Sequence, residues 1–201
     1  MKNERGVVQF VAIGAAVILL GFAAWAIGTY NSLVVRSENV NRSWSTVESQ
    51  YQRRLDLVPN LVETVKGSAK FEKETLTAVV EARSRATSVN VDKSVLNDPA
   101  AFKKFEAAQA GLSSALSRLM VVVEKYPDIK STEAYRDLTV QLEGTENRIQ
   151  VARKDFNEAA QDYNVSIKVF PSSVIAGMGG FKERPYFQSA AAAAQAPAVK
   201  F

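Results

Sequence analysis

The sequence predicts an all-α protein in which an N-terminal transmembrane helix continues into an elongated antiparallel four-helix bundle. Three observations lead to this fold class. Residues 7–27 contain no charged side chain, apolar residues after residue 30 recur at steps of three and four, and the alternation typical of strands is missing. Prolines and polar loops divide the periodic region into segments that suit antiparallel packing with short connections.

The N-terminal apolar segment predicts a membrane anchor over residues 1–28. Its 21 uncharged residues would form a helix of ~30 Å at ~1.5 Å per residue, which matches the hydrocarbon thickness of a bilayer. A cleaved secretory signal is the alternative, because Lys2 and Arg5 precede the segment and Ala24 to Ala26 offer a small-residue cleavage pattern. Signal segments are shorter, with apolar regions of ~7 to 15 residues. We therefore expect an uncleaved, single-pass anchor in the cell membrane.

The charges around this segment leave the side of the soluble region open. Lys2 and Arg5 precede the segment, whereas Arg36 and Arg42 follow it. The count leans only slightly toward an inside N-terminus and an exported domain. The chain contains no cysteine, so disulfide bonds give no indication of the compartment.

The first amphipathic stripe follows the anchor directly. No proline separates them, so the two can form one rod of about 50 residues that ends or bends at Pro59, which lacks a backbone N–H. We expect a second helix to open with Pro59 and to run to about Arg85. The stripes of these two helices comprise Leu33, Val40, Trp44, Val47, Tyr51, Leu55 and Val58, followed by Val62, Val65, Ala69, Leu76 and Val79.

Start and stop signals define two further helices. Residues 87–97 form a loop rich in Ser, Asn and Asp, and Asp98 before Pro99 is a capping pattern for a third helix that ends at Pro127. Ser131, with Glu133 in the first turn, starts a fourth helix whose apolar spacing continues as far as residue 170. An extended intermolecular coiled coil is the alternative, because the spacing also fits heptads.

The sequence changes character after Pro171. Three glycines with apolar residues between them predict a hook over residues 172–187 that docks on the bundle or on a partner. Residues 188–201 are mainly alanine and predict a flexible tail. The expected organisation is an anchor over residues 1–28, a helical bundle with its hook over 29–187, and the tail over 188–201.

Several stretches of the chain form a recognisable pattern when they are taken together. They are Tyr30, Asn31, Leu33, Val34, Arg36, Val40, Trp44, Ser45, Arg53, residues 55–62, residues 65–67, LMVVVEKYP from Leu119, GTENR from Gly144, Ala152, Arg153, DYNVSIKVFP from Asp162, Gly180 and Phe181. In combination these stretches resemble the LemA family. The resemblance covers residues 1 to about 187 and implies a single N-terminal transmembrane helix, with a short N-terminus outside and a helical domain in the cytoplasm. That orientation opposes the charge count. The resemblance implies no defined reaction, and the Ala-rich tail does not match it.

Composition excludes several classes of catalytic site. The chain contains no histidine and no cysteine, which excludes ordinary zinc sites, Cys or His nucleophile systems and a Ser-His-Asp triad. Gly177, Gly179 and Gly180 lack the Lys and the Ser or Thr of a phosphate loop. We expect no enzyme activity, no cofactor and no small-molecule substrate; an enzyme that uses only carboxylates and lysines is the alternative. The net charge of +4 is spread over helices with alternating charges, so we expect no nucleic acid partner.

Eight polar residues near the first bend and on the fourth helix form a candidate polar network or partner-binding patch. In a structural interpretation, Asp56 or Asn60 caps the second helix, and Asn147 and Arg148 reach across the bundle to it, because buried charges need partners. In a functional interpretation, the residues form a recognition patch at the membrane-distal end, ~40 Å from residue 28. The eight residues are Arg53, Arg54, Asp56, Asn60, Glu143, Glu146, Asn147 and Arg148.

Two further polar residues, Glu72 and Gln109, fall on otherwise apolar stripes. Polar residues in the seam of a coiled coil set the register of its helices. The alternative is a position at the edge of the stripe, where the side chain reaches water.

These features favour a membrane-tethered, non-enzymatic scaffold of the bacterial cell envelope. We expect it to contact the lipid bilayer and either to form a homo-oligomer or to hold another membrane protein. The alternatives are a transmembrane signalling module, in which the rod transmits a displacement, and an envelope-maintenance module such as an accessory to a membrane protease. Small residues of the anchor suit close contact between membrane helices, namely Gly14, Ala15, Ala16, Ala23 and Ala24.

Overall fold

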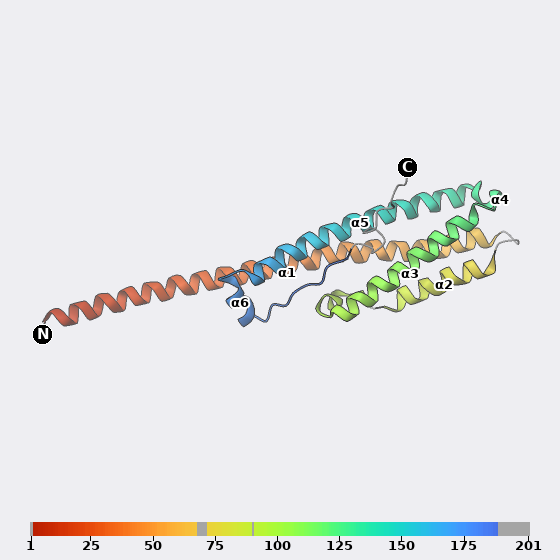
Figure 1. Ribbon diagram of the computed structural model, residues 1–201. Coiled ribbons are helices and arrows are strands. Elements are labelled where there is room, and N and C mark those ends of the chain that lie inside the picture. The colour runs from red at the N-terminus through yellow and green to blue at the C-terminus, as the bar shows by residue number, and fades with distance from the viewer. Residues whose placement is uncertain (1, 68–71, 90, 189–201) are drawn as a thin grey trace, which may run out of the picture.

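The computed structural model describes residues 2–67, 72–89 and 91–188, and these residues contain helices but no strand (Figure 1). The predicted all-α class is confirmed. The elements are α1 (Lys2–Lys66), α2 (Lys73–Ser88), the 3-10 helix η1 (Lys93–Asn97), α3 (Pro99–Val123), α4 (Pro127–Lys130), α5 (Glu133–Lys168) and α6 (Ser172–Met178).

The first helix, α1, runs through Pro59 without ending, so the predicted end of the helix at this residue, with a second helix opening there, is wrong. A proline leaves the carbonyl four residues earlier without its helical donor. Here that carbonyl belongs to Leu55, and the Nε of Arg83 in α2 donates a hydrogen bond to it at 3.0 Å. This tertiary contact compensates for the lost backbone bond, and α1 continues to Lys66. The second helix therefore begins at Lys73.

The capping pattern at Asp98 is confirmed. The Asp98 carboxylate accepts hydrogen bonds from the backbone N–H groups of Ala100 and Ala101 at 2.8 and 3.2 Å. Pro99 follows as the first residue of α3. An acidic cap and a proline with helical φ therefore begin the helix where the local sequence predicts it.

The connections before and after α3 each contain a short helix. The first, η1, lies in the predicted loop over residues 87–97 and buries Val95 and Leu96. Pro127 follows the end of α3 as predicted, but it also begins the single turn of α4, in which Ile129 is buried. Both connections therefore add apolar side chains to the core.

The long helix α5 begins after Thr132 and not after Ser131. The Thr132 hydroxyl accepts a hydrogen bond from the backbone N–H of Tyr135 at 3.3 Å, whereas the Ser131 hydroxyl donates to the carbonyl of Asp128. Both residue types can cap a helix. Ser131 is the C-terminal cap of the unpredicted turn α4, so the next residue, Thr132, caps the start of α5.

The four long helices α1, α2, α3 and α5 lie side by side, and each runs antiparallel to the next along the chain (Figure 1). The helices α1 and α5 pack along each other, and the hairpin of α2 and α3 packs at the end of the body remote from the N-terminus. This arrangement is consistent with the predicted antiparallel four-helix bundle.

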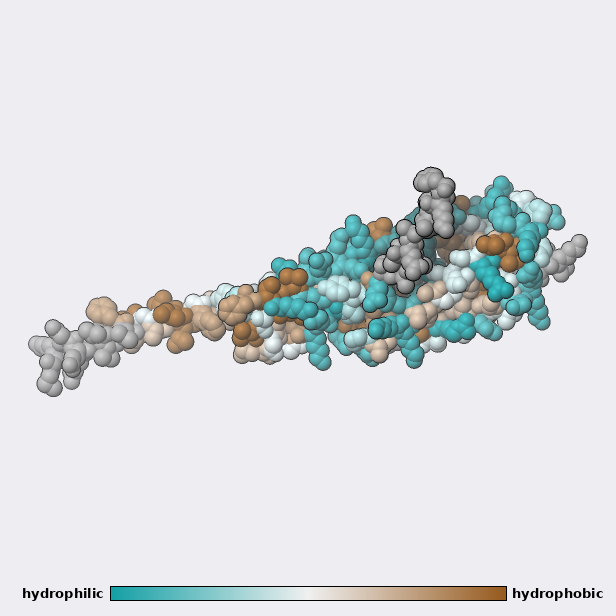
Figure 2. Space-filling view, in the orientation of Figure 1, coloured by the Kyte–Doolittle hydropathy of each residue, from teal (hydrophilic) through white to brown (hydrophobic). Residues whose placement is uncertain are grey.

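The first part of α1 projects alone from the packed body. Among the described residues, one helix is long and apolar enough to cross a membrane, and this helix is α1. Its apolar stretch is not buried by any other element, and Figure 2 shows hydrophobic side chains along it. Its length and composition therefore meet the physical requirements of the predicted anchor.

The buried apolar side chains form two clusters along the body. The proximal cluster, nearer the projecting part of α1, is rich in aromatic side chains, whereas the distal cluster is mainly Leu and Val. The proximal cluster comprises Leu33, Val40, Trp44, Val47, Tyr51, Val95, Leu96, Phe102, Phe105, Ile149, Ala152, Phe156, Ala160, Tyr163, Ile167, Ala176 and Phe187. The distal cluster comprises Leu55, Leu57, Val58, Leu61, Val62, Val65, Val79, Ala82, Ala86, Leu112, Leu116, Leu119, Val122, Val123, Ile129, Tyr135 and Leu142.

Buried polar side chains lie at the junction of the two clusters. Arg54, Gln109 and Thr145 come from α1, α3 and α5, and each is at most 3% exposed. Along each helix, the polar residue falls between the last residue of one cluster and the first residue of the other. A polar layer therefore divides the apolar core near the middle of the body.

The C-terminal segment folds back onto the helices. After α6, residues 181–188 run as an extended chain along the proximal half of the body (Figure 1). Ala176 and Phe187 of this segment are buried. The segment predicted as a hook thus docks on the chain's own helices, and the predicted flexible tail lies outside the described residues except for Gln188.

Candidate functional site

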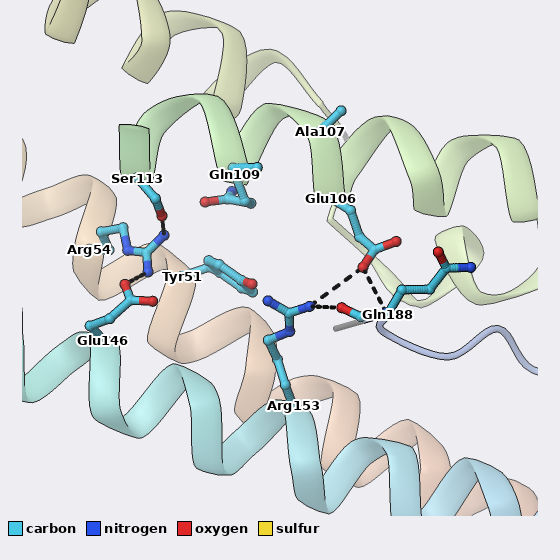
Figure 3. Close-up of a pocket in the computed structure, with 10 residues that line it drawn as sticks. Tyr51, Arg54, Glu106, Ala107, Gln109, Ser113, Glu146, Arg153 and Gln188 are labelled. Carbon is cyan, nitrogen blue, oxygen red and sulfur yellow. Dashed lines mark hydrogen bonds and ion pairs between the residues drawn. The ribbon is translucent and has the colours of Figure 1, made fainter. Parts of the chain in front are cut away.

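A cleft opens at the polar layer between α1, α3 and α5, with the end of the extended C-terminal segment at its rim (Figure 3). Its volume is about 300 Å³. Six of the ten residues that line it carry a charged or amide side chain. The residues that line it are Tyr51, Arg54, Glu106, Ala107, Gln109, Ala110, Ser113, Glu146, Arg153 and Gln188.

Arg54 forms the buried end of the cleft. One of its guanidinium nitrogens donates to the Ser113 hydroxyl at 3.0 Å, and another pairs with the Glu146 carboxylate. The guanidinium carbon also lies 5.3 Å from the centre of the Tyr51 ring. Burial lowers the pKa of Arg54. A buried guanidinium needs a paired anion and further hydrogen bonds. Glu146 and Ser113 supply these, so the charge of Arg54 is compensated.

Arg153 forms the opposite end of the cleft. It lies 3.6 Å from the Glu106 carboxylate, and it donates a hydrogen bond to the backbone carbonyl of Gln188 at 3.0 Å. Its guanidinium carbon is 4.5 Å from the centre of the Phe187 ring. Burial raises the pKa of Tyr51, which lies between the two arginines, while their positive charges act in the opposite direction. The cleft therefore has a positively charged group at each end.

Gln109 lies in the cleft between these two ends, on α3 (Figure 3). It is 3% exposed, and neither its amide nitrogen nor its amide oxygen has a hydrogen-bond partner among the described residues. Leaving such a buried polar group unsatisfied costs ~1 to 3 kcal/mol. The interpretation of Gln109 as an edge residue is wrong, whereas Glu72, the other polar stripe residue, is exposed at the start of α2.

The extended backbone of residues 184–188 runs along α5 to the rim of the cleft, where Gln188 bonds to both α5 and α3, and we call this path the groove. The side-chain amide of Asn164 accepts from the backbone N–H of Arg184 and donates to its carbonyl, both at 2.8 Å. Asn157, one heptad earlier on α5, makes the same pair of bonds with Phe187, both at 2.9 Å. Each side-chain carboxamide thus forms hydrogen bonds with both the N–H and the C=O of one backbone residue.

This pattern of backbone recognition continues to the rim of the cleft. The backbone N–H of Gln188 donates to the Glu106 carboxylate at 3.3 Å, and its carbonyl accepts from Arg153. Glu106 and Gln109 are three residues apart on α3 and therefore share one face of the helix. The next carboxamide beyond the end of the described backbone is consequently Gln109, which has both groups unpaired.

Of the eight polar residues predicted as a patch, Arg54 and Glu146 meet in this cleft. Arg53, Asp56 and Asn60 are exposed on α1. The Asp56 carboxylate accepts from Gln52 within the same helix at 2.8 Å. The predicted cap at Asp56 or Asn60 is therefore wrong, because α1 does not begin a new helix there.

The other members of the predicted patch lie elsewhere on α5. Glu143 is exposed, whereas Asn147 and Arg148 line a different cavity of about 320 Å³. Arg148 donates to Gln50 at 3.3 Å and to Thr145 at 3.2 Å, and so does not reach Asp56 or Asn60 as predicted.

The patch is also not at the end of the body. Arg54 lies between the two apolar clusters, because α1 continues for a further 12 residues beyond it. The predicted position at the membrane-distal end is therefore wrong.

Several residues of the cleft and its groove were not selected from the sequence. Asn157 and Asn164 carry a signal that could have identified them, since polar residues seven positions apart on an amphipathic helix share one face. Tyr51 looked like an ordinary core residue, and Glu106 and Ser113 carry no local signal. The described residues contain no group of three or more potential metal ligands.

The small residues of the anchor lie on the exposed surface of α1. A side chain added at Gly14 would meet no described atom within 4 Å. Their role in contacts between membrane helices stays a prediction. The residues are Gly14, Ala15, Ala16, Ala23 and Ala24.

Comparison with known proteins assigns the chain to a family, and the matched part of the chain contains the cleft. The sequence profile of the LemA family matches residues 43–201, which is more than half of the chain. The chain belongs to the LemA family. All residues that line the cleft fall within the matched range. The resemblance stated from the sequence motifs is therefore confirmed.

Individual relatives of this LemA-family chain carry two names. Magnetosome protein MamQ 2 of Paramagnetospirillum magneticum is 30% identical over 200 residues, which cover 92% of this chain and 74% of the relative. Magnetosome protein MamQ of Magnetospirillum gryphiswaldense is 29% identical over 202 residues, with the same coverage. Protein LemA of Metamycoplasma hominis is 23% identical over 172 residues, covering 85% of this chain and 74% of the relative. None of these names denotes an enzyme.

Proposed function

We propose that the protein is a membrane-tethered, non-enzymatic scaffold whose cleft holds an extended segment of a protein partner at the bilayer. The projecting apolar part of α1 supplies the tether, because its length and exposure suit a single membrane crossing. The packed body then presents the cleft at a fixed distance from the membrane.

The observation that carries this proposal is the unpaired carboxamide of Gln109. A buried side chain that lacks both of its hydrogen-bond partners within the described residues reduces stability, so its presence in the cleft needs an explanation. A peptide group satisfies both atoms at once, as the backbone of Phe187 does for Asn157 in the same groove. An extended peptide is therefore the ligand whose chemistry matches Gln109.

The charges of the cleft add to this match. Arg54 and Arg153 lie at its two ends, and each is already paired with a carboxylate. A segment that brought a net charge would disturb these pairs, so a segment with polar, uncharged side chains fits best. The Ser113 hydroxyl accepts from Arg54, and no hydrogen bond joins it to a carboxylate among the described residues. It is therefore not placed as an activated nucleophile.

Site-specific crosslinking in native membranes tests the proposal. A photo-reactive residue replaces Ala110, which is exposed at the cleft, or Val121, which is exposed elsewhere on α3. The probe at position 110 is expected to yield a defined adduct with a partner protein, and the probe at position 121 is not. Gln109→Met is expected to reduce the adduct about tenfold, which corresponds to ~1.4 kcal/mol of lost binding free energy. Gln141→Met, at an exposed glutamine of α5, is the matched control.

Three results would contradict the proposal. The adduct could form equally at both probe positions, or it could be unchanged by Gln109→Met while the variant stays folded. The probe could also react with residues 189–201 of the same chain, which follow the rim residue Gln188 in the sequence. That outcome would identify the chain's own C-terminus as the occupant.

Transmembrane signalling is a second candidate function, and the continuity of α1 favours it. A single helix joins the apolar segment to the distal cluster without a break at Pro59. Insertion of two glycines between Gly28 and Asn31 would interrupt that helix. A signalling protein loses its output on this insertion, whereas a scaffold still gives the crosslink at position 110.

A further inference from the structure

The outer face of α6 and of the turn before it carries large apolar side chains that no other described element covers. Phe170, Val174 and Met178 are spaced by four residues and are 83%, 52% and 84% exposed. Phe170 and Met178 are thus at least as exposed as Phe10, at 78%, in the projecting apolar part of α1. Exposed apolar patches of this kind mark contacts with a membrane or a protein.

The inner face of the same segment is packed against the body. Ala176 is buried, and the backbone N–H of Phe181 donates to its carbonyl at 3.1 Å. The Ser172 hydroxyl lies 2.7 Å from the carbonyl of Ser166 in α5. These contacts fix which face of α6 points outward. Rotation of the helix to bury its apolar face would break them.

The segment lies at the level where the apolar part of α1 ends. Val169 and Ser172 line a separate cavity together with Trp25 and Gly28 of α1. The rings of Tyr30 and Phe181 are 5.5 Å apart. Figure 2 shows hydrophobic atoms where α6 lies beside α1, next to the projecting helix.

The absence of a side chain at Gly179 allows the segment to pack closely against α1. A Cβ atom at this position would lie 2.7 Å from the Phe181 ring and 3.1 Å from the Tyr30 ring. Glycine is therefore required for the observed packing. The position of α6 along α1 is consequently set by contacts, and not by the length of the preceding turn.

We infer that the segment from Phe170 to Met178 inserts its apolar face into the interface of the bilayer that α1 crosses, as a second membrane contact. This inference rests on the proposed tether. An amphipathic helix whose apolar face points outward lies in the plane of the interface, with that face at the boundary between headgroups and acyl chains. Phe170, Val174 and Met178 occupy this position.

Lipid fits this surface better than a protein partner does. The patch adjoins the apolar segment of α1, so the two form one apolar surface at the expected depth of the interface. Trp25 and Tyr30 lie at the same level, and such aromatic side chains favour the membrane–water boundary. Arg36 and Lys182 are exposed beside this region and suit anionic headgroups.

A second membrane contact would orient the body. A single helix that crosses the bilayer leaves the body free to rotate and tilt, whereas a contact on one side of that helix restricts both. From Tyr30 to Arg54 the continuous helix rises ~36 Å at ~1.5 Å per residue. The cleft would then face a defined direction at this height above the interface.

Single-cysteine spin labelling tests the inference, because the chain contains no native cysteine. The full-length protein carrying Met178→Cys is labelled with a nitroxide and reconstituted into vesicles of phosphatidylcholine and phosphatidylglycerol. Collision of the label with oxygen, which partitions into lipid, is compared with collision with a water-soluble nickel chelate. Leu19→Cys in the apolar segment and Val121→Cys on the body are the two reference positions.

The label at position 178 is expected to resemble the one at position 19, with oxygen collisions exceeding nickel collisions, whereas the label at 121 shows the reverse. If position 178 behaves like 121 while 19 is in lipid, the inference is wrong and the tether stands. If position 19 is also accessible to nickel, the proposed tether itself fails. Spin–spin broadening at position 178 without lipid contact would identify a second copy of the chain as the occupant.

Charge substitution provides an independent measurement. Phe170→Asp with Met178→Asp is expected to transfer a label at Val174→Cys from lipid to water. The matched control, Val121→Asp with Val140→Asp, changes two exposed apolar residues of the body and is expected to leave that label in lipid. Circular dichroism establishes that both variants keep their helix content. An unchanged lipid signal in the first variant would contradict the inference.

Discussion

The proximal and distal halves of the body share the three long helices α1, α3 and α5 but are completed in different ways. In the distal half, α2 adds Val79, Ala82 and Ala86 to the side chains of these three helices. In the proximal half, the extended segment over residues 181–188 lies along these helices and inserts Phe187 among Trp44, Phe102 and Phe156. The comparison shows that the described backbone fills the groove as far as Gln188, which lies at the rim of the cleft.

The two halves also differ in how polar groups are satisfied. In the proximal half, Asn157 and Asn164 each bind both polar groups of a backbone residue. At the junction, Gln109 is as buried as a core residue but has neither bond within the described chain. A carboxamide that binds a peptide contributes to stability, whereas an unpaired one reduces it. We expect mutations at these positions to have opposite effects.

Removal of Phe187 is expected to have the largest effect on this comparison. Phe187→Ala deletes a buried ring that contacts four aromatic side chains, and such substitutions lower the free energy of unfolding by ~3 to 5 kcal/mol. Urea denaturation in detergent micelles measures the loss. Tyr186→Ala, at the preceding exposed residue, is the control and is expected to change stability by less than ~1 kcal/mol. Equal effects of the two variants would show that the extended segment does not complete the proximal core.

The side-chain amides of Asn157 and Asn164, which each bind the N–H and the C=O of one backbone residue, are called carboxamide clamps here. Loss of one clamp is expected to have the next largest effect. Asn157→Leu leaves the N–H and C=O of Phe187 without their partner, and the expected destabilisation is ~1 to 3 kcal/mol. Amide hydrogen exchange at Phe187 is expected to accelerate in parallel. Asn147→Leu, at an exposed asparagine of the same helix, is expected to leave both measurements unchanged. An Asn157→Leu variant with unchanged exchange would contradict the role of the clamp.

Substitution of Gln109 is expected to act in the opposite direction. Gln109→Met keeps the length of the side chain and removes the unpaired amide, so the free energy of unfolding of the purified protein should rise by ~1 kcal/mol. The midpoint of urea denaturation measures this change. A loss of stability would show that the amide is satisfied within the protein, and it would remove the observation that carries the proposed function.

The smallest effect is expected at alkaline pH. Burial raises the pKa of Tyr51 above its ordinary value of 10.0, so the folded protein holds this proton more tightly than the unfolded chain does. Above pH ~10, ionisation of this tyrosine lowers the free energy of the unfolded chain relative to that of the folded protein. Stability therefore falls as pH rises. Tyr51→Phe is expected to make this decline less steep in thermal melts between pH 9 and 11, whereas Tyr186→Phe, at an exposed tyrosine, serves as the control. Identical declines for Tyr51→Phe and the unmodified protein would contradict the assignment.

Much of the fold could be predicted because its signals are local. The apolar stripes located the long helices, and Asp98 with Pro99 marked the start of α3 correctly. Pro59 misled the prediction, since its local effect is offset by Arg83, which lies 24 residues further along the chain. Ser131 was one residue from the true cap because the intervening turn of α4 carries only a weak signal.

Less of the candidate site could be predicted. Arg54 and Glu146 were selected as polar residues on apolar helices, and the structure pairs them. Asp56, Asn60 and Arg148 were selected on the same grounds but have other neighbours. Helical periodicity gives the face on which a side chain lies, but not the height at which residues of two helices meet. The clamp residues were missed because an asparagine on a helix is ordinarily a solvated residue.

The sequence by itself determined that this protein is helical, that it carries one uncharged apolar segment, and that it lacks the side chains of Cys-based, His-based and ordinary zinc chemistry. These properties follow from composition and from contacts within about four residues. The tertiary structure decided the continuity of α1, the division of the core, the clamps on the C-terminal backbone and the burial of Gln109. Those features depend on hydrogen bonds and desolvation between residues 20 or more positions apart, which local sequence patterns do not encode.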